Sequence, residues 1–376
     1  MRSTKPTAVI ALGAIVTTIA ALTVWKTALA DEPDRDRDDR EHFLIADQFN
    51  NRVIEVDADG KIIWHFGLGP ADFSAKSIIG CNDAQRVGSL TLMAGTGTPG
   101  GQPEAPDCTN PNGCPDDRVI LVDHGGRIVW QYGHFRVAGS GPDQLNTPVQ
   151  NTWLPNGHVL ITDQANERII EVNLFKQVVW QYGMNGVSGN GPDQLNNPNC
   201  AELLENGHIL ICDENNNQAL EVTHTMPSTI VNTYTVAGGQ LFMGVAFASR
   251  LPNGHTLITD SGNNRIVETD EAGNVYFQYF TNNDPKSNPR CLSPGNCTGP
   301  LPTRAVRLRN GDTLISDQYN HRVIEVNDDG EIVRTFGKIN SLGYNKANVG
   351  NGGLNSPYDA KRVGDYTGLT PPFEHE

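Results

Sequence analysis

An internal repeat limits what this chain can fold into more than any other feature of its sequence. An apolar strand, the motif Asp-x-x-Asn-x-Arg and a second, alternating strand occur together five times. The copies carry Asp47/Asn50/Arg52, Asp163/Asn166/Arg168, Asp213/Asn216 with Gln218, Asp260/Asn263/Arg265 and Asp317/Asn320/Arg322. A unit that returns every ~40 to 57 residues indicates a repeat architecture, so the structure of one unit defines the fold.

Each repeat contains two further predicted strands. One precedes the motif and ends in a Leu-Pro-Asn-Gly-like turn, and the other follows it and ends in an aromatic residue and glycine. The turns are Leu154–Gly157, Leu204–Gly207, Leu251–Gly254 and Leu308–Gly311. Asn-Gly between alternating runs strongly favours a hairpin. We therefore expect each repeat to be a four-stranded antiparallel meander, which is the blade of a β-propeller.

Counting the repeats predicts six blades and an all-β fold. The second blade is degenerate. Its second and third strands are residues 90–94 and 118–122, with an insertion between them. The first copy lacks its opening strand, but residues 356–363 resemble residues 80–87, the opening strand of the second blade. We expect this C-terminal strand to complete the first blade, because a closed ring hides its strand edges. The sequence thus predicts a six-bladed β-propeller over residues 42–363.

The segments outside the propeller have the composition of an export signal and of linkers. Residues 1–30 combine a basic start, an apolar stretch and a small-x-small pattern at their end, which indicates a secretory signal peptide. An uncleaved membrane anchor is the alternative, because the apolar stretch is long. Residues 31–41 form a charged linker and residues 364–376 a C-terminal tail. The predicted location is periplasmic or extracellular, with membrane association only if the signal stays uncleaved.

The chain has seven cysteines, which in an exported protein point to disulfides with at least one thiol left over. The pairs expected to staple small loops are Cys108/Cys114 and Cys291/Cys297, with Cys200/Cys212 as a further candidate across a predicted hairpin. A metal site is the alternative at the two loops, but neither has the His or the paired Cys-x-x-Cys of a zinc site. Cys81 has no evident partner.

The repeat motifs resemble two known groups of propellers. Asp-x-x-Asn-Asn-Arg, with Gly-x-Gly-Pro-Asp-Gln-Leu-Asn-x-Pro at residues 139–148 and 189–198, looks like NHL-repeat propellers. The Leu-Pro-Asn-Gly-His turns and Trp-Gln-Tyr-Gly strands resemble bacterial arylsulfotransferase-like propellers. The second resemblance implies a histidine nucleophile in the channel, whereas the innermost strands of this chain contain no histidine. Six-bladed lactonases and lyases, which this fold resembles, imply a metal ion on the axis.

Residues that repeat from blade to blade are expected to be structural, because an active site occurs once. This applies to the Asp and Arg of the motif, to His158, His208 and His255, and to Trp64, Trp130 and Trp180. The informative residues are instead the non-repeating ones on the innermost strands, which line the axis. Aligning those strands places Asp83, Gln150, Cys200, Phe247, Arg304 and Asp359 at one level. The predicted axial ligand site consists of Asp83, Gln150, Asn151, Cys200, Glu202, Arg304, Asp359 and Lys361.

Two interpretations of this axial site compete. In the first, Asn82, Asp83 and Asp359 offer oxygen ligands to a hard cation such as Ca²⁺. In the second, Arg304 neutralises Asp83 and Asp359, which gives either a polar ligand pocket or a salt-bridged plug. An arginine at the same level would repel a cation, so the second interpretation is favoured.

The charge and the loops narrow the function to two hypotheses. A net charge of −15 and the lack of a Lys/Arg block argue against nucleic acid. The leading hypothesis is a monomeric binding module that takes a small molecule or a protein at its axial pocket and upper loops, chiefly residues 95–117 and 281–300. The alternative is an enzyme that uses the axial pocket, either a metal-dependent lyase or hydrolase or a diverged arylsulfotransferase.

Overall fold

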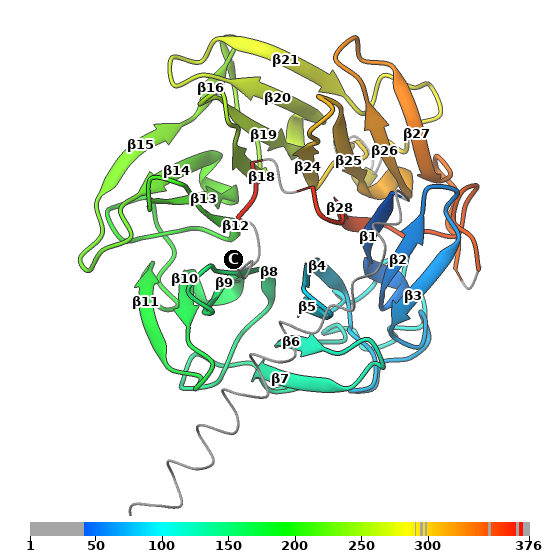
Figure 1. The fold of residues 1–376 in the computed structure, drawn as a ribbon, viewed down its shortest axis with the longest axis horizontal. Coiled ribbons are helices and arrows are strands. Elements are labelled where there is room, and N and C mark those ends of the chain that lie inside the picture. The colour runs from blue at the N-terminus through cyan, green and yellow to red at the C-terminus, as the bar shows by residue number, and fades with distance from the viewer. Residues whose placement is uncertain are drawn as a thin grey trace, which may run out of the picture.

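The computed structural model describes residues 41–289, 299–344, 347–365 and 368–370, and the backbone of residues 291–293 and 296–297. In these residues, six four-stranded antiparallel sheets form a ring around a central axis (Figure 1). The predicted six-bladed propeller is therefore confirmed. The predicted signal (1–30) and nearly all of the charged linker lie outside the described residues.

The strands of each blade follow one another in order from the axis outwards. Blade one contains β28 (Pro357–Arg362), β1 (His42–Asp47), β2 (Arg52–Asp57) and β3 (Ile62–Phe66). Blade two contains β4 (Cys81–Val87), β5 (Leu90–Gly95), β6 (Arg118–Val122) and β7 (Ile128–Gly133). Blade three contains β8 (Pro148–Trp153), β9 (Val159–Asp163), β10 (Arg168–Val172) and β11 (Val178–Tyr182).

Blades four to six have the same order. Blade four contains β12 (Pro198–Leu203), β13 (Ile209–Asp213), β14 (Gln218–Val222) and β15 (Ile230–Tyr234). Blade five contains β18 (Val245–Arg250), β19 (Thr256–Asp260), β20 (Arg265–Thr269) and β21 (Val275–Phe280). Blade six contains β24 (Arg304–Arg307), β25 (Thr313–Asp317), β26 (Arg322–Val326) and β27 (Ile332–Gly337). Two small hairpins are β16 (Val236–Ala237) with β17 (Gln240–Leu241), and β22 (Cys291–Ser293) with β23 (Asn296–Cys297).

Short 3₁₀ helices follow the second strand of five blades and define what we call the upper face. They are η1 (Gln48–Asn50), η2 (Gln164–Asn166), η3 (Glu214–Asn216), η4 (Ser261–Asn263) and η5 (Gln318–Asn320). The innermost strands begin at this face and end at the lower face, where the Asn-Gly turns lie. In blade three, for example, the Gly157 N–H donates to Leu154 O at 2.9 Å, and Gly157 has a φ of 80°, which only glycine adopts without strain.

The two ends of the repeat array meet in blade one, as predicted. β28 pairs antiparallel with β1, with Phe43 opposite Arg362 and Ile45 opposite Ala360. Figure 1 shows the last strand, in red, beside the first, in blue. The ring is closed by main-chain hydrogen bonds, so the inner edge of β1 is not left unpaired.

The hydrophobic core is divided among the interfaces between blades. Phe43 and Ile45 of blade one pack with Leu314 and Phe336 of blade six, and the Phe43 and Phe336 ring centroids are 4.9 Å apart. The repeated tryptophans also join neighbouring blades, as their repeated position predicted. Their indole N–H groups donate to main-chain oxygens of the next blade: Trp64 to His124, Trp130 to Leu174 and Trp180 to Thr225.

The Asp-x-x-Asn-x-Arg motif is a structural device, as predicted. In blade three, Asp163 Oδ2 accepts hydrogen bonds from Asn166 Nδ2 and Arg168 Nε, both at 2.8 Å. Asp163 Oδ1 accepts a third from the N–H of Asn146, in the loop from the preceding blade. One buried carboxylate therefore fixes the 3₁₀ turn and the incoming loop. Blade four uses Gln218 in place of the arginine, and its amide donates to Asp213 at 2.8 Å.

The structural role of the Asp–Arg pair can be tested by copying the glutamine that replaces the arginine in blade four. Arg168→Ala should lower the free energy of unfolding by about 3 kcal/mol, because it leaves the buried Asp163 without a counter-charge. Arg168→Gln should cost about half as much, since it copies the arrangement at Gln218. Urea unfolding measures both. The control is Arg127→Ala at an exposed ion pair, which should change stability by less than about 0.5 kcal/mol. Equal effects of all three variants would contradict the assigned role.

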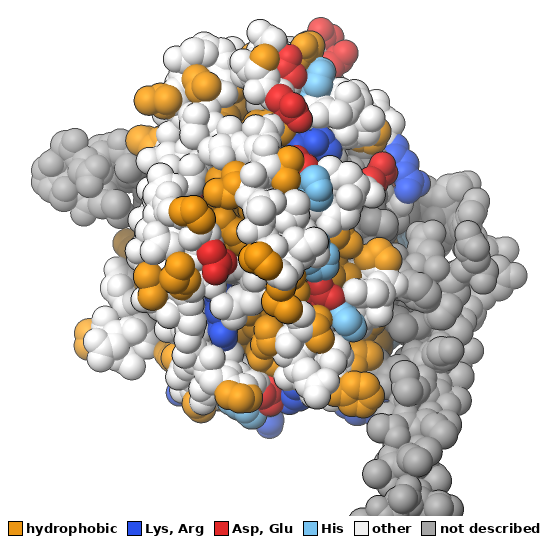
Figure 2. Space-filling model, turned by 90° about the vertical axis from the view of Figure 1, so that its left-hand side faces the viewer, with side chains coloured by type: hydrophobic (Ala, Val, Ile, Leu, Met, Phe, Trp, Pro, Cys, Tyr) orange, Lys and Arg blue, Asp and Glu red, His pale blue; other side chains and the backbone are white. Residues whose placement is uncertain are grey.

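The repeated histidines, each just before the second strand of its blade, also form local pairs with acids of the third strand. The Nδ1 atoms of His158, His208 and His255 lie 2.5 to 2.8 Å from the carboxylates of Glu171, Glu221 and Glu268, respectively. Figure 2 shows one side of the ring, where histidine side chains lie near acidic ones and hydrophobic side chains lie among polar ones. These pairs support the structural interpretation of the three histidines.

Two disulfides are present in the described residues. Cys108–Cys114 staples the loop 95–117, and Cys200–Cys212 links β12 to β13, as predicted. Cys81 is buried and free. The strands that carry Cys291 and Cys297 pair in register, but the side chains of these two residues lie outside the described part. No helix among the described residues is long and apolar enough to span a membrane.

Candidate functional site

The six innermost strands surround the axis (Figure 1) and are tied to one another by side chains of the predicted level. In three successive blades, this side chain accepts a hydrogen bond from a main-chain N–H of the next blade. The contacts are Ala84 N–H to Asp359 Oδ2 (3.1 Å), Asn151 N–H to Asp83 Oδ2 (3.0 Å) and Ala201 N–H to Gln150 Oε1 (3.1 Å). The small residues at 84 and 201 leave room for this approach. These side chains therefore hold neighbouring blades together.

Three residues of this level and Lys361, two positions further along β28, form a buried cluster of two acids and two bases. We call it the axial ion cluster: Asp83, Asp359, Arg304 and Lys361. Arg304 Nη2 lies 2.8 Å from Asp83 Oδ1, and Arg304 Nε lies 2.7 Å from Asp359 Oδ1. Lys361 Nζ lies 2.7 Å from Asp83 Oδ1 and 2.5 Å from Asp359 Oδ2. The Arg304 guanidinium also lies 4.0 Å from the centroid of the Phe247 ring. Four of the eight predicted site residues thus neutralise one another on the axis.

The charges in this cluster are set by burial and by the two cations. Burial opposes ionisation of Asp83, but Lys361 and Arg304 outweigh it, so the pKa of Asp83 lies below its usual range. Burial raises the pKa of Asp359 despite the same two partners. Burial acts against the charged form of Arg304 too, but Asp359 and Asp83 raise its pKa. In this cluster both carboxylates are paired with Arg304 and Lys361.

The predicted calcium donors do not fit a calcium ion in this arrangement. The carboxylates of Asp83 and Asp359 are paired with cations, and Asn82 Oδ1 accepts a hydrogen bond from Gln48 Nε2 at 2.8 Å. A divalent cation would have to displace Arg304 and Lys361 from their carboxylates. In the part of the chain that the structure describes, no group of three or more His, Cys, Asp or Glu side chains is placed to hold a metal.

Below the axial ion cluster, Thr370 of the C-terminal tail lies between residues of two innermost strands. Glu202 Oε1 accepts from Gln150 Nε2 at 2.6 Å, and its Oε2 accepts from the N–H and the hydroxyl of Thr370 at 3.1 and 2.9 Å. Gln85 Nε2 donates to Thr370 O at 3.2 Å. Thr370 is 3% exposed and connects blades two and four at the lower face. Thr370 therefore occupies the lower end of the channel.

The remaining predicted residues have separate positions. Asn151 Nδ2 donates to Asp83 and so supports the axial ion cluster. Cys200 is 1% exposed, and its sulfur is bonded to Cys212, so it offers no thiol to a ligand. Gln150 and Glu202 bond to each other in the layer that contacts the tail. The predicted residues thus form the filled interior of the channel.

The upper end of the channel contains a group, which we call the axial mouth: Asn197, Asn199, Glu214 and Tyr358. The sequence indicated only Asn199, as an oxygen donor near the axis, and not the other three. Glu214 begins η3, and its Oε2 accepts hydrogen bonds from Asn197 Nδ2 and Asn199 Nδ2, both at 2.9 Å. The Tyr358 hydroxyl donates to Asn199 Oδ1 at 3.1 Å. Figure 1 places β28, which carries Tyr358, across the ring from β12. The contact therefore crosses the axis from blade one to blade four.

The acid of the axial mouth has neutral partners. Glu214 Oε1 has no hydrogen-bond partner among the described residues, and both partners of Oε2 are amides. Burial raises the pKa of Glu214 to about 7, although the bonds from Asn199 and Asn197 act in the opposite direction. Burial and the charge of Glu214 raise the pKa of Tyr358 above its usual range. Glu214 therefore changes its charge near neutral pH.

The sequence contained a signal for Glu214. The residue after the motif aspartate is Gln48, Gln164, Ser261 or Gln318 in four blades, and it is an acid only at Glu214. A single charge at a position that is otherwise neutral marks a non-repeating function. A comparison of the innermost strands does not reveal this residue, because Glu214 lies beyond the end of β13.

The stapled loop 95–117 lies against the upper face beside blades one and six. Ala105, Cys108 and Cys114 of this loop pack with Phe49 of η1 and Tyr319 of η5. Asn355 Nδ2 donates to the main-chain oxygen of Glu104, in the same loop, at 2.7 Å. The predicted recognition loop is therefore attached to the upper face by both apolar and polar contacts.

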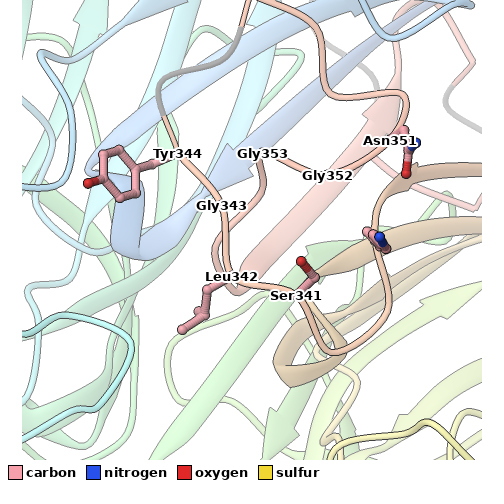
Figure 3. Close-up of a pocket in the computed structure, with 8 residues that line it drawn as sticks. Ser341, Leu342, Gly343, Tyr344, Asn351, Gly352 and Gly353 are labelled. Atoms are coloured by element: carbon pink, nitrogen blue, oxygen red, sulfur yellow. The ribbon is translucent and has the colours of Figure 1, made fainter.

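A separate cavity of about 390 Å³ lies in the connection between β27 and β28 (Figure 3). Its lining consists of Lys338, Ser341, Leu342, Gly343, Tyr344, Asn351, Gly352 and Gly353. Leu342 and Tyr344 are more than half exposed. This lining contains no carboxylate or imidazole, so the axial mouth offers the richer chemistry.

Comparisons with known proteins give structural neighbours but no family. No protein-family model and no curated protein sequence matches the chain. A protein of unknown function from Bacteroides caccae is similar in structure, with 15% identity, a TM-score of 0.53, and coverage of 80% of this chain and 97% of that one. The periplasmic gluconolactonase of Pseudomonas aeruginosa has 12% identity, a TM-score of 0.48, and coverage of 86% and 99%.

Virginiamycin B lyase from Staphylococcus aureus is also similar, with 14% identity, a TM-score of 0.42, and coverage of 68% of this chain and 69% of that one. At such identities a structural likeness shows the fold alone. This chain is a six-bladed β-propeller whose structural neighbours include enzymes and proteins of unknown function.

Proposed function

We propose that this protein is an exported binding module that takes a small polar ligand at its axial mouth. One observation carries the proposal: at the upper end of the channel, away from Thr370, the Glu214 carboxyl has one bonded oxygen and one oxygen without a partner among the described residues. The two disulfides are compatible with export. The resemblance to NHL-repeat propellers supports a binding role, and the anchored loop 95–117 supplies a rim for recognition.

The rigidity of the channel supports binding at this place. The axial ion cluster and the inter-blade hydrogen bonds fix the positions of β28 and β12, and thereby of Tyr358 and Asn199. A preformed polar surface loses little conformational entropy when a ligand binds, which favours affinity for a small molecule.

Glu214→Gln provides the direct test. In a thermal-shift screen of small polar compounds, we expect hits on the wild-type protein that disappear in Glu214→Gln. The matched control is Glu205→Gln, which makes the same change at an exposed lower-face turn and should keep every hit. Hits that both variants retain would place the ligand elsewhere, and the proposed site would then be abandoned.

A second candidate is an enzyme, and the charge state of Glu214 favours it. A carboxyl with a pKa of about 7 can both accept and donate a proton near neutral pH, as a general base or acid must. In this case turnover should follow the ionisation of Glu214 and be lost in Glu214→Gln, whereas a binding module turns nothing over. A screen of lactones, esters and lyase substrates, with metal analysis of the purified protein, separates the two. A sulfotransferase has less support, because the innermost strands carry no histidine.

A further inference from the structure

We infer that the ligand of the axial mouth carries an ammonium group, which donates hydrogen bonds to Glu214 Oε1 and to the Tyr358 hydroxyl oxygen. This inference rests on the proposed function and adds the chemical class of the ligand. Three features of the described residues carry it: the direction of the hydrogen bonds, the charge of the surroundings, and the commitment of the nearby cations.

The direction of the hydrogen bonds leaves acceptors at both ends of the path that joins Tyr358 to Glu214. The Tyr358 hydroxyl gives its single proton to Asn199 Oδ1, and Asn199 gives an amide proton to Glu214 Oε2. The hydrogen bonds therefore run from the tyrosine hydroxyl through the amide to the carboxylate. At these two ends a ligand meets a lone pair on the Tyr358 hydroxyl oxygen and the unbonded Glu214 Oε1. The carboxylate oxygen is purely an acceptor when Glu214 is ionised. A ligand group that bonds to Glu214 Oε1 must therefore donate, and an ammonium group has three donors.

The charge of the surroundings favours a cation over a neutral donor. Blade four has Gln218 where the other four copies of the motif have arginine. Asp213, next to Glu214, accordingly receives its side-chain hydrogen bonds from the neutral groups of Asn216 and Gln218. Asn197 also joins Glu214 to a third acid, because its N–H donates to Glu167 Oε2 at 2.6 Å. A positive ligand group would supply the counter-charge that this blade lacks.

The nearby cationic side chains are already paired with other acids. Arg304 and Lys361, below the axial mouth, each pair with both Asp83 and Asp359. They offset the charge of those two carboxylates and leave Glu214 uncompensated. An anionic ligand would meet an acid without a basic partner, so the axial mouth discriminates against it.

The test uses three probes of the same size and different charge: n-butylammonium, 1-butanol and butyrate. The readout is the side-chain amide signals of Asn197 and Asn199 in ¹H–¹⁵N spectra of the mature protein. We expect n-butylammonium to shift both signals, with at least about tenfold weaker binding of 1-butanol and no response to butyrate. Glu214→Gln should weaken n-butylammonium binding by about tenfold or more, and Tyr358→Phe by a smaller factor. Glu205→Gln should leave it unchanged.

The pH dependence adds an independent readout. Lowering the pH from 8 to 6 protonates Glu214 while the amine stays charged, so n-butylammonium binding should weaken by about tenfold. Equal binding of 1-butanol and n-butylammonium, unaffected by Glu214→Gln, would overturn the ammonium inference and leave a neutral-ligand site standing. If none of the three probes shifts either amide signal in the folded protein, both the proposed axial site and the ammonium inference are wrong.

Discussion

Replacing Arg304 with methionine should lower the free energy of unfolding by about 3 to 5 kcal/mol, although the substitution leaves a side chain of similar length on the axis. Arg304 is 4% exposed and pairs with both Asp83 and Asp359. Without it, two buried carboxylates would share the single charge of Lys361. The cost of an uncompensated buried charge is large, whereas the packing against Phe247 would be largely retained.

Arg309→Met is the matched control for this experiment. Arg309 is 71% exposed at its side chain and lies 4.0 Å from Asp365, so its loss should change stability by less than about 0.5 kcal/mol. Urea unfolding at pH 7 measures both variants. A near-wild-type stability for Arg304→Met would mean that the axial ion cluster does not stabilise the folded propeller. The expected loss also makes Arg304 and Asp83 poor positions for testing ligand binding, because destabilisation would mask the effect on the site.

The second large effect is a pH dependence that Glu214→Gln removes. Glu214 has a folded-state pKa of about 7, above its ordinary value of 4.5, so the folded protein binds this proton more tightly than the unfolded chain. The contribution of Glu214 to the free energy of unfolding is fully present below the pKa of the unfolded chain. It is lost as the pH rises from about 4.5 through about 7. Discounted for the partial exposure of the side chain, the loss is about 2 to 3 kcal/mol.

The measurement is the difference in stability between Glu214→Gln and the wild type from pH 5 to pH 8. We expect it to rise with pH in favour of the variant. Other buried acids, such as Asp117 and Asp317, have pKa values raised to about 6, but they titrate in both proteins and cancel in the difference. Glu205→Gln should follow the wild-type curve. A flat difference for Glu214→Gln would show that Glu214 is solvated and ionised throughout, which would remove the charge argument for its ligand.

Much of the fold could be predicted because its information is local and repeated. Every copy of Asp-x-x-Asn-x-Arg forms the same turn, and the turns of the Leu-Pro-Asn-Gly type set the hairpins, so one interpretation applied to the whole ring. The closing strand β28 could be predicted because residues 356–363 resemble another blade's first strand. The alignment of the innermost strands also brought Asp83, Arg304 and Asp359 to one level, where the structure places them.

The rest of the site depends on contacts that no local pattern contains. Tyr358 meets Asn199 across the axis, and Thr370 reaches blades two and four from an irregular tail. Such contacts depend on the width of the ring and on the path of a loop, which the repeat does not encode. The sequence reasoning also placed the site among the innermost strands, whereas the uncompensated acid lies on a 3₁₀ helix above them.

The pairing of β28 with β1 has a consequence for the order of folding. During synthesis β1 emerges first, but its inner partner is made last, so blade one must wait for the rest of the ring. Until then the inner edge of β1 offers unpaired main-chain groups, which can pair with another chain. This pairing joins residues far apart in the sequence, and such contacts slow folding. Aggregation during refolding should therefore originate at the seam in blade one, and a chain that ends before Pro357 should never complete the ring.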